Sequence, residues 1–162
     1  VRILESGAGG RCDVALHKYC FVDFNRDAGK PEEVFEHYRA AVERVHRQFP
    51  DLVLAHVTTP LTVARPDIVD RVRLIFQGRV PNCFRDNASR QQYNELLRKA
   101  YAGREPLFDL AKVESTRPDG TTALSDGVRA LVPSYSSDGG HLNAKGSDVV
   151  ARALIAFLAS LP

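Results

Sequence analysis

The sequence has no methionine and no tryptophan, and it holds only three cysteines among 162 residues. Cys12, Cys20 and Cys83 form no CxxC pair, and we interpret them as small buried residues, with one disulfide as the alternative. No cluster of histidine, cysteine and carboxylate has the spacing of a metal site, so neither a metal nor another cofactor is expected. No apolar run approaches the ~20 residues that a membrane-spanning helix needs.

A strong charge of one sign is also missing. The 22 basic and 20 acidic side chains leave a formal net charge of +2, and the basic residues are spread along the chain, so no nucleic-acid partner is expected. No secretory signal pattern follows Val1. Because position 1 is not methionine, we expect that sequence upstream of Val1 was removed or never recorded. A secreted, periplasmic or cytoplasmic location and the oligomeric state therefore stay open.

What the sequence does contain is typical of a globular domain, with 44% hydrophobic and 26% charged residues. Residues 13–22 and 52–58 are nearly continuous apolar runs, which predict buried strands. Apolar side chains recur at helical spacing from Pro31 to about Gln48, with proline in the first turn, and predict a helix there. A strand, a helix and a strand with short links predict a right-handed parallel crossover.

The second half of the chain predicts more helix than strand. Three further helices are expected, over 67–77, from Asn87 or Ser89 to Tyr101, and over 144–160. A short third strand is expected at 106–110, and 114–137 reads as irregular. Without repeats or linkers, residues 1–162 predict one α/β domain. Because open parallel sheets usually have about five strands, we expect the first strand or strands of the domain to be absent.

The most informative stretch is S-D-G-G-H-L-N at 137–143, directly before the last helix. Asp138 and His141 lie three residues apart in a glycine turn, an arrangement that can form the acid–base half of a nucleophilic triad. The histidine would relay a proton, and the carboxylate would hold its tautomer and stabilise the imidazolium. Taken alone, the pair has another interpretation, in which Asp138 caps the turn and His141 is incidental.

No serine stands out as the nucleophile. Ser6, in the sequence E-S-G-A-G-G, lacks a preceding strand, and the glycines after it are typical of a helix end. Ser136 and Ser137 are too close to His141 in sequence to be its usual partner. Neither alternative is favoured.

Several segments in order resemble one family. Residues 138–146 read D-G-G-H-L-N-A-K-G, 93–98 read Y-N-E-L-L-R and 107–110 read L-F-D-L. The first is similar to the closing D-x-x-H block of the SGNH (GDSL-type) hydrolases, a family of esterases and acylhydrolases, and the other two look like the helix and strand before that block. Residues 13–23 and 56–62 look like strands and loops of a bacterial branch of the family.

The resemblance implies a flavodoxin-like three-layer α/β/α fold with a parallel sheet, and a site at the carboxyl ends of its strands, where ligands bind in open α/β sheets. Carried over residue by residue, it makes His141 the general base for a serine and Asp138 its orienting carboxylate. The chain departs from the family in two places. No G-D-S block is present, and the segment aligned with the family's G-x-N-D block reads C-F-V-D at 20–23. Asn25, two residues out of register, is the candidate replacement for the oxyanion-hole asparagine.

The resemblance therefore implies a serine esterase of acyl or acetyl esters, carbohydrate esters among them, whose serine lies outside this chain. These 162 residues alone are then expected to be inactive. The alternative is a non-catalytic binding or scaffold domain that kept the fold and lost its nucleophile. A Rossmann-type nucleotide binder is disfavoured because no glycine fingerprint follows a strand.

Other titratable residues have structural interpretations. His17 and His56 lie in predicted strands and are expected to be core histidines with satisfied hydrogen bonds. Glu33 and His37 lie one turn apart on the first helix, which is too few ligands for a metal site. Lys18 falls in a predicted buried strand, where an unpaired ammonium is costly, so it is expected at the strand rim or paired with a carboxylate such as that of Asp23.

Overall fold

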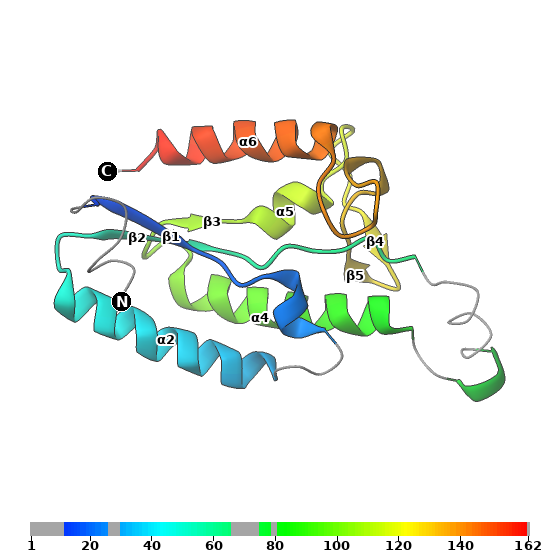
Figure 1. Cartoon of the computed structure of the whole chain (residues 1–162), viewed down its shortest axis with the longest axis horizontal. Coiled ribbons are helices and arrows are strands. Elements are labelled where there is room, and N and C mark those ends of the chain that lie inside the picture. The colour runs from blue at the N-terminus through cyan, green and yellow to red at the C-terminus, as the bar shows by residue number, and fades with distance from the viewer. Residues whose placement is uncertain (1–11, 26–29, 66–74, 79–80, 162) are drawn as a thin grey trace.

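The computed structural model describes residues 12–25, 30–65, 75–78 and 81–161. Within them three parallel strands form a sheet in the order β1-β2-β3, with the bounds Val14–His17, Val53–Val57 and Leu107–Phe108. Helix α6 (Ala144–Leu158) covers one face of this sheet, and α2 (Pro31–Gln48) and α4 (Asn82–Tyr101) cover the other (Figure 1). The fold is the flavodoxin-like three-layer α/β/α architecture that the resemblance implied.

The crossover β1-α2-β2 confirms the sequence prediction. Helix α2 has the predicted bounds, because Pro31 sits where a missing N–H costs nothing and the inward positions are apolar. The backbone N–H of Phe49 donates to the carbonyl of Val45 at 2.8 Å and ends the helix. Strand β1 then pairs in parallel with β2, with Val14 opposite Val53.

The first strand is shorter and less buried than predicted. Pairing with β2 ends at His17, and the chain turns into a 3-10 helix, η1 (Phe21–Phe24). The Asp23 carboxylate accepts the N–H of Cys20 at 2.7 Å, which bonds this backbone locally instead of to a neighbouring strand. Within the described residues β1 lies at an edge of the sheet, and the Leu16 side chain is 43% exposed.

Two other elements differ in their bounds from the sequence prediction, and a third lies mostly outside the described residues. Helix α4 begins at Asn82, directly after Pro81, and not at Asn87 or Ser89, although it ends at Tyr101 as predicted. The third strand covers Leu107–Phe108 only, because the Asp109 side chain accepts the N–H of Lys112 and starts α5 (Leu110–Ser115), which was not predicted. Of the predicted helix 67–77, residues 67–74 lie outside the described residues, and 75–77 are helical.

The stretch 114–137, predicted to be irregular, contains short ordered elements. Strands β4 (Leu124–Ser125) and β5 (Val128–Arg129) form an antiparallel hairpin. Its two turn residues, Asp126 and Gly127, both have positive φ, 50° and 77°, as a type I′ turn requires. A 3-10 helix, η2 (Pro133–Tyr135), then leads into the loop before α6.

Different side chains fill the two sides of the sheet. Between the sheet and helices α2 and α4 lies an aromatic core that includes Phe24, Phe35, Tyr38, Tyr93 and Tyr101. On the other side α6 packs its apolar face onto the sheet, with the rings of Phe157 and Phe108 5.5 Å apart. In the described ranges no helix is long and apolar enough to cross a bilayer.

The isolated titratable residues and cysteines follow the sequence interpretation in part. His56 is fully buried with both ring nitrogens bonded, as expected of a core histidine. His17 is exposed at the end of the edge strand, so that interpretation is wrong for it. Lys18 is exposed just beyond β1, at the strand rim. The three cysteines form no disulfide with one another. Cys12 is exposed and Cys20 and Cys83 are only partly buried, so the interpretation as buried residues is wrong.

Candidate active site

The loop before α6 is anchored at both ends by hydrogen bonds that the D-G-G-H-L-N-A-K-G block supplies. The Asn143 side chain accepts the N–H of Gly146 at 3.0 Å and so caps α6. Its amide nitrogen donates to the carbonyl of Ser134 at 3.1 Å, and its backbone N–H donates to that of Tyr135 at 2.8 Å. A Cβ at Gly146 would lie 2.5 Å from the Tyr135 carbonyl oxygen, so only glycine allows this close packing.

Asp138 organises the tip of this loop. Its Oδ1 accepts the backbone N–H groups of Gly140 at 2.8 Å and His141 at 2.7 Å, and its Oδ2 lies 2.7 Å from His141 Nδ1. The backbone and side-chain hydrogen bonds from His141, with the one from Gly140, hold the pKa of the Asp138 carboxyl far below its ordinary value. The carboxylate therefore stays ionised, and only its acceptor oxygens face the imidazole.

This contact sets the tautomer of His141. An ionised carboxylate accepts only, so Nδ1 of the neutral ring must carry the proton and Nε2 must carry the lone pair. The side chain of His141 is 76% exposed, against 58% for that of Asp138. The imidazole is therefore held in one orientation, and its Nε2 has no hydrogen-bond partner among the described residues.

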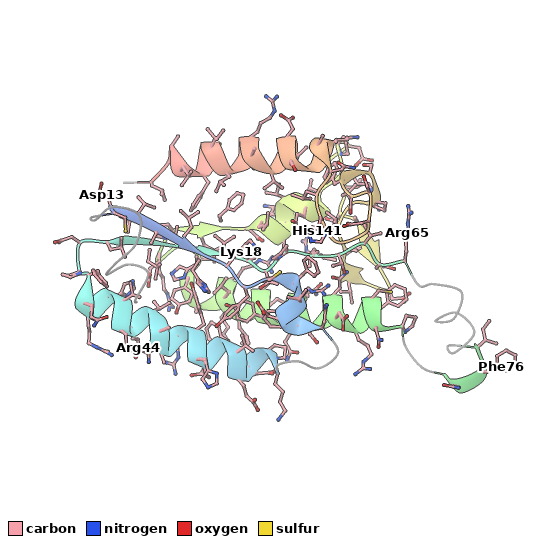
Figure 2. All side chains as sticks on the ribbon, in the orientation of Figure 1. Asp13, Lys18, Arg44, Arg65, Phe76 and His141 are labelled. Atoms are coloured by element: carbon pink, nitrogen blue, oxygen red, sulfur yellow. The ribbon has the colours of Figure 1, made fainter. Side chains whose placement is uncertain are left out.

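The pair lies where a site is expected in this fold. Beyond their carboxyl ends, β1 leads into η1 and β3 leads into α5 (Figure 1). Strand β2 leads into residues 58–65, which meet the loop that carries His141 (Figure 2). The ring of Phe21, in η1, meets that of His141 edge to face with centroids 5.5 Å apart. A Cβ at Gly140 would lie 3.3 Å from the Phe21 ring, so glycine lets η1 approach the loop closely.

A small polar hollow adjoins the pair. It has a volume of about 280 Å³ and lies between the segment of Val63 and Arg65 and the loop at 133–139. The N–H of Val63 donates to the Gly139 carbonyl at 2.8 Å and joins the two segments.

The structure brings some of the candidate residues together and separates others. Asp138 and His141 are in contact. Asn25 directly follows η1, and its side-chain oxygen accepts a hydrogen bond from the Arg90 guanidinium. The hydroxyl of Ser136 donates to the His141 carbonyl at 2.7 Å and accepts the N–H of Gly139 at 2.9 Å, so it is engaged in the loop and not with Nε2. Ser6 lies outside the described residues.

Sequence reasoning missed two polar residues beneath the site. Asn87 and Arg90 are each 1% exposed on the inward face of α4. Both lie on the same face of α4 as the apolar residues Tyr93 and Leu97. Polar residues at positions where the helical pattern expects apolar ones were therefore the signal in the sequence that could have identified them. Among the described residues, no three histidine, cysteine or carboxylate side chains gather as metal ligands would.

Comparison with known proteins finds similarity to solved structures. No family model matches the chain, and no curated protein matches its sequence. A candidate platelet activating factor from Streptococcus pneumonia aligns over 93% of this chain with a TM-score of 0.63 and 17% identity. A peptidoglycan O-acetylesterase aligns over 91% with a TM-score of 0.60 and 13% identity. This chain spans 61% and 37% of those two chains, and at these identities the similarity shows a shared fold.

Proposed function

We propose that this chain is part of an SGNH-type ester hydrolase in which His141 is the general base and Asp138 its orienting carboxylate. The observation that carries the proposal is the 2.7 Å contact between His141 Nδ1 and Asp138 Oδ2, which leaves Nε2 open at the carboxyl edge of a parallel sheet. The fold shared with a peptidoglycan O-acetylesterase supports the same reaction class. The proposed substrate is an acyl or acetyl ester of a small molecule or a carbohydrate.

The nucleophile in this proposal is a serine from outside these 162 residues. Its hydroxyl proton passes to His141 Nε2 as the oxygen attacks the ester carbonyl, and Asp138 stabilises the imidazolium that forms. The tetrahedral intermediate collapses when the C–O bond to the alcohol breaks, and the alcohol leaves with the proton from Nε2. Water then loses a proton to Nε2 and attacks the acyl-enzyme, which releases the acid and restores the serine.

The test compares this chain with the product of its gene that includes the upstream coding sequence. Both are assayed for release of nitrophenolate from 4-nitrophenyl acetate. The longer protein is expected to turn over, and the 162-residue chain is not, since loss of a triad member costs on the order of 10⁶ in kcat. His141→Ala is expected to abolish turnover in the longer protein. His37→Ala, which removes an exposed histidine of α2, is the matched control and is expected to have no effect.

Three outcomes would contradict parts of this proposal. Turnover that survives His141→Ala would remove the imidazole from the mechanism. Turnover by the 162-residue chain that His141→Ala abolishes would place the nucleophile inside the chain. Absence of turnover in both proteins, on a panel of acetyl and longer acyl esters, would favour the non-catalytic scaffold domain.

A further inference from the structure

A groove lies between α5 and α6, beside the end of β3, and the mechanism proposed above does not use it. Its volume is about 590 Å³, which is within the range of small-molecule binding sites. We call it the α5/α6 groove. Much of its wall is carbon, from the side chains of Phe108, Val113, Pro118, Tyr135, Val149 and Ala153.

Three cationic side chains also line the α5/α6 groove. Lys112 lies on α5, Arg117 follows that helix, and Lys145 lies in the first turn of α6. Lys145 Nζ is 5.9 Å from the centre of the Tyr135 ring, so its ammonium lies against a wall of the groove. Arg117 Nη1 donates to the Thr122 carbonyl at 2.7 Å, which holds the guanidinium without neutralising it. Within the described ranges none of the three cations forms an ion pair with a carboxylate.

Three acidic side chains in or beside the α5/α6 groove are already engaged by other groups. Asp109 accepts two hydrogen bonds from the Arg98 guanidinium, at 2.8 and 2.7 Å. Asp148 is paired with Arg152 at 2.9 Å. Asp119 accepts an N–H and a hydroxyl from the turn that follows it, at 2.9 and 2.7 Å. The described part of the chain therefore supplies the groove with cations but with no carboxylate to pair with them.

We propose that the α5/α6 groove binds an amphipathic carboxylate, a small molecule with an apolar body and one anionic end. The apolar body lies against the carbon walls, where each buried methylene strengthens binding about fourfold. The carboxylate faces the two lysines and the arginine, whose apolar stems line the groove while their charged ends stay hydrated at its mouth. A concave site of this size suits a small molecule better than a flat surface. This inference does not depend on the proposed esterase function.

The test titrates octanoate into the longer protein in a calorimeter. Octanoate has both parts of the proposed ligand, whereas acetate has only the carboxylate and 1-octanol has only the chain. Octanoate is expected to bind with a Kd below about 1 mM. Acetate is expected to bind at least about tenfold more weakly, and 1-octanol at least about threefold more weakly. No binding of octanoate at about 1 mM, or an equal affinity for either of the other two compounds, would overturn the inference.

A pair of variants locates the bound octanoate. Ala153→Phe fills the α5/α6 groove from the side of α6, so it is expected to weaken octanoate binding at least about tenfold. Ala156→Phe adds the same ring at an exposed position of α6 outside the groove lining and is expected to leave binding unchanged. The Tm of each variant shows whether its fold is kept. Equal affinities in the two variants would place octanoate elsewhere and overturn the inference.

A second pair of variants tests the charges. Lys112→Gln/Lys145→Gln is expected to weaken octanoate binding about three- to tenfold and to leave 1-octanol binding unchanged. Lys30→Gln/Lys99→Gln makes the same change in net charge at two exposed lysines outside the groove lining and is expected to keep both affinities. An equal loss in both double variants would assign the effect to the overall charge of the protein and overturn the role of the groove.

A membrane surface is the competing occupant. Co-sedimentation with phosphatidylglycerol vesicles tests it, and the longer protein is expected to stay in the supernatant. Sedimentation that Lys112→Gln/Lys145→Gln abolishes, together with no binding of octanoate, would replace the small-molecule site by a membrane-binding surface.

Failure of this inference differs from failure of the proposed function. His141→Ala leaves the α5/α6 groove unchanged, so this variant is expected to bind octanoate as the wild type does, whatever its effect on turnover. Loss of octanoate binding in His141→Ala would place the ligand at the candidate active site and overturn the inference.

Discussion

Two of the histidine–carboxylate pairs in the described part of the chain differ in nearly everything except composition. His141 and Asp138 form one at the surface, with side chains 76% and 58% exposed. His56 and Glu105 form the other at 3.0 Å beneath the sheet, where the His56 side chain is 0% exposed. Of these two pairs, only the surface one leaves a ring nitrogen without a hydrogen-bond partner in the ranges that the structure describes. A histidine beside a carboxylate therefore does not by itself indicate catalysis.

The buried pair is closed by its neighbours. Tyr38 donates its hydroxyl proton to His56 Nδ1 at 2.6 Å, Nε2–H donates to Glu105, and the ring stacks on that of Tyr101 at 3.8 Å. Burial lowers the pKa of His56, although the hydrogen bond to Glu105 offsets part of this effect. The ring is thus kept neutral with both nitrogens occupied, which suits packing and not proton transfer.

The largest expected effect comes from Asp138→Asn in the longer protein. The asparagine keeps an oxygen for the N–H groups of Gly140 and His141, but it presents an NH₂ group to Nδ1. This forces the proton onto Nε2, so kcat is expected to fall about 10⁴-fold with little change in Tm. Asp148→Asn, at an exposed acid paired with Arg152 on α6, is the control and should keep kcat. A loss of less than tenfold for Asp138→Asn would contradict the assigned tautomer.

The second effect tests the buried pair by stability. His56→Ala removes a stacked ring, leaves the Tyr38 hydroxyl without its partner and leaves the Glu105 carboxylate paired with His46 alone. The free energy of unfolding is expected to fall by about 3 kcal/mol in a urea titration. Tyr38→Phe removes one hydrogen bond and should cost about 1 kcal/mol. If His56→Ala left stability unchanged, the structural role of this pair would be wrong.

Two carboxylates extend the comparison, because Asp138 is exposed and Glu114 is buried. Burial raises the pKa of Glu114 to about 7, although its carboxylate accepts the N–H of Leu61 at 2.8 Å. The folded state therefore holds this proton more tightly than the unfolded state. Its contribution to stability is present below a pH of about 4.5 and is lost as the pH rises through about 7.

Glu114→Gln keeps the acceptor oxygen without the charge. At a pH of about 8 the variant is expected to be more stable than the wild type by roughly 1 to 3 kcal/mol, with no gain at a pH of about 4. Urea titrations at both values measure the difference. An equal gain at both would point to packing and not to ionisation.

The smallest expected effect is a difference between His56 and His141 in how each contributes to the pH dependence of stability. Because the pKa of folded His56 is lowered from 6.5, its neutral ring favours the folded state above that pH. Stability is expected to fall as the pH drops below 6.5 toward the folded-state pKa. His56→Gln should flatten this part of the profile of Tm against pH, whereas His141→Ala should leave it in place. An identical profile in wild type and His56→Gln would exclude His56 as the cause.

How much could be predicted from sequence depended on the range of the contacts. Helix α2 was predicted at both ends because its signals, Pro31 and an apolar stripe, lie within the helix. The contact of Asp138 with His141 spans three residues and was predicted for the same reason. The start of α4 was missed because the cap was placed at Asn87 or Ser89, and α5 was missed because Asp109 was assigned to a strand.

The amino-acid sequence alone determined the features that local patterns and short-range contacts specify. These are the amphipathic helices, the parallel crossover and the aspartate–histidine turn. Only tertiary folding decided which histidine keeps an open nitrogen, and it placed Arg90 against groups 65 and 69 residues away. Hydrogen bonds between distant segments leave no periodic trace in a sequence. They depend on burial, which removes water as the competing partner and so commits each donor to one acceptor.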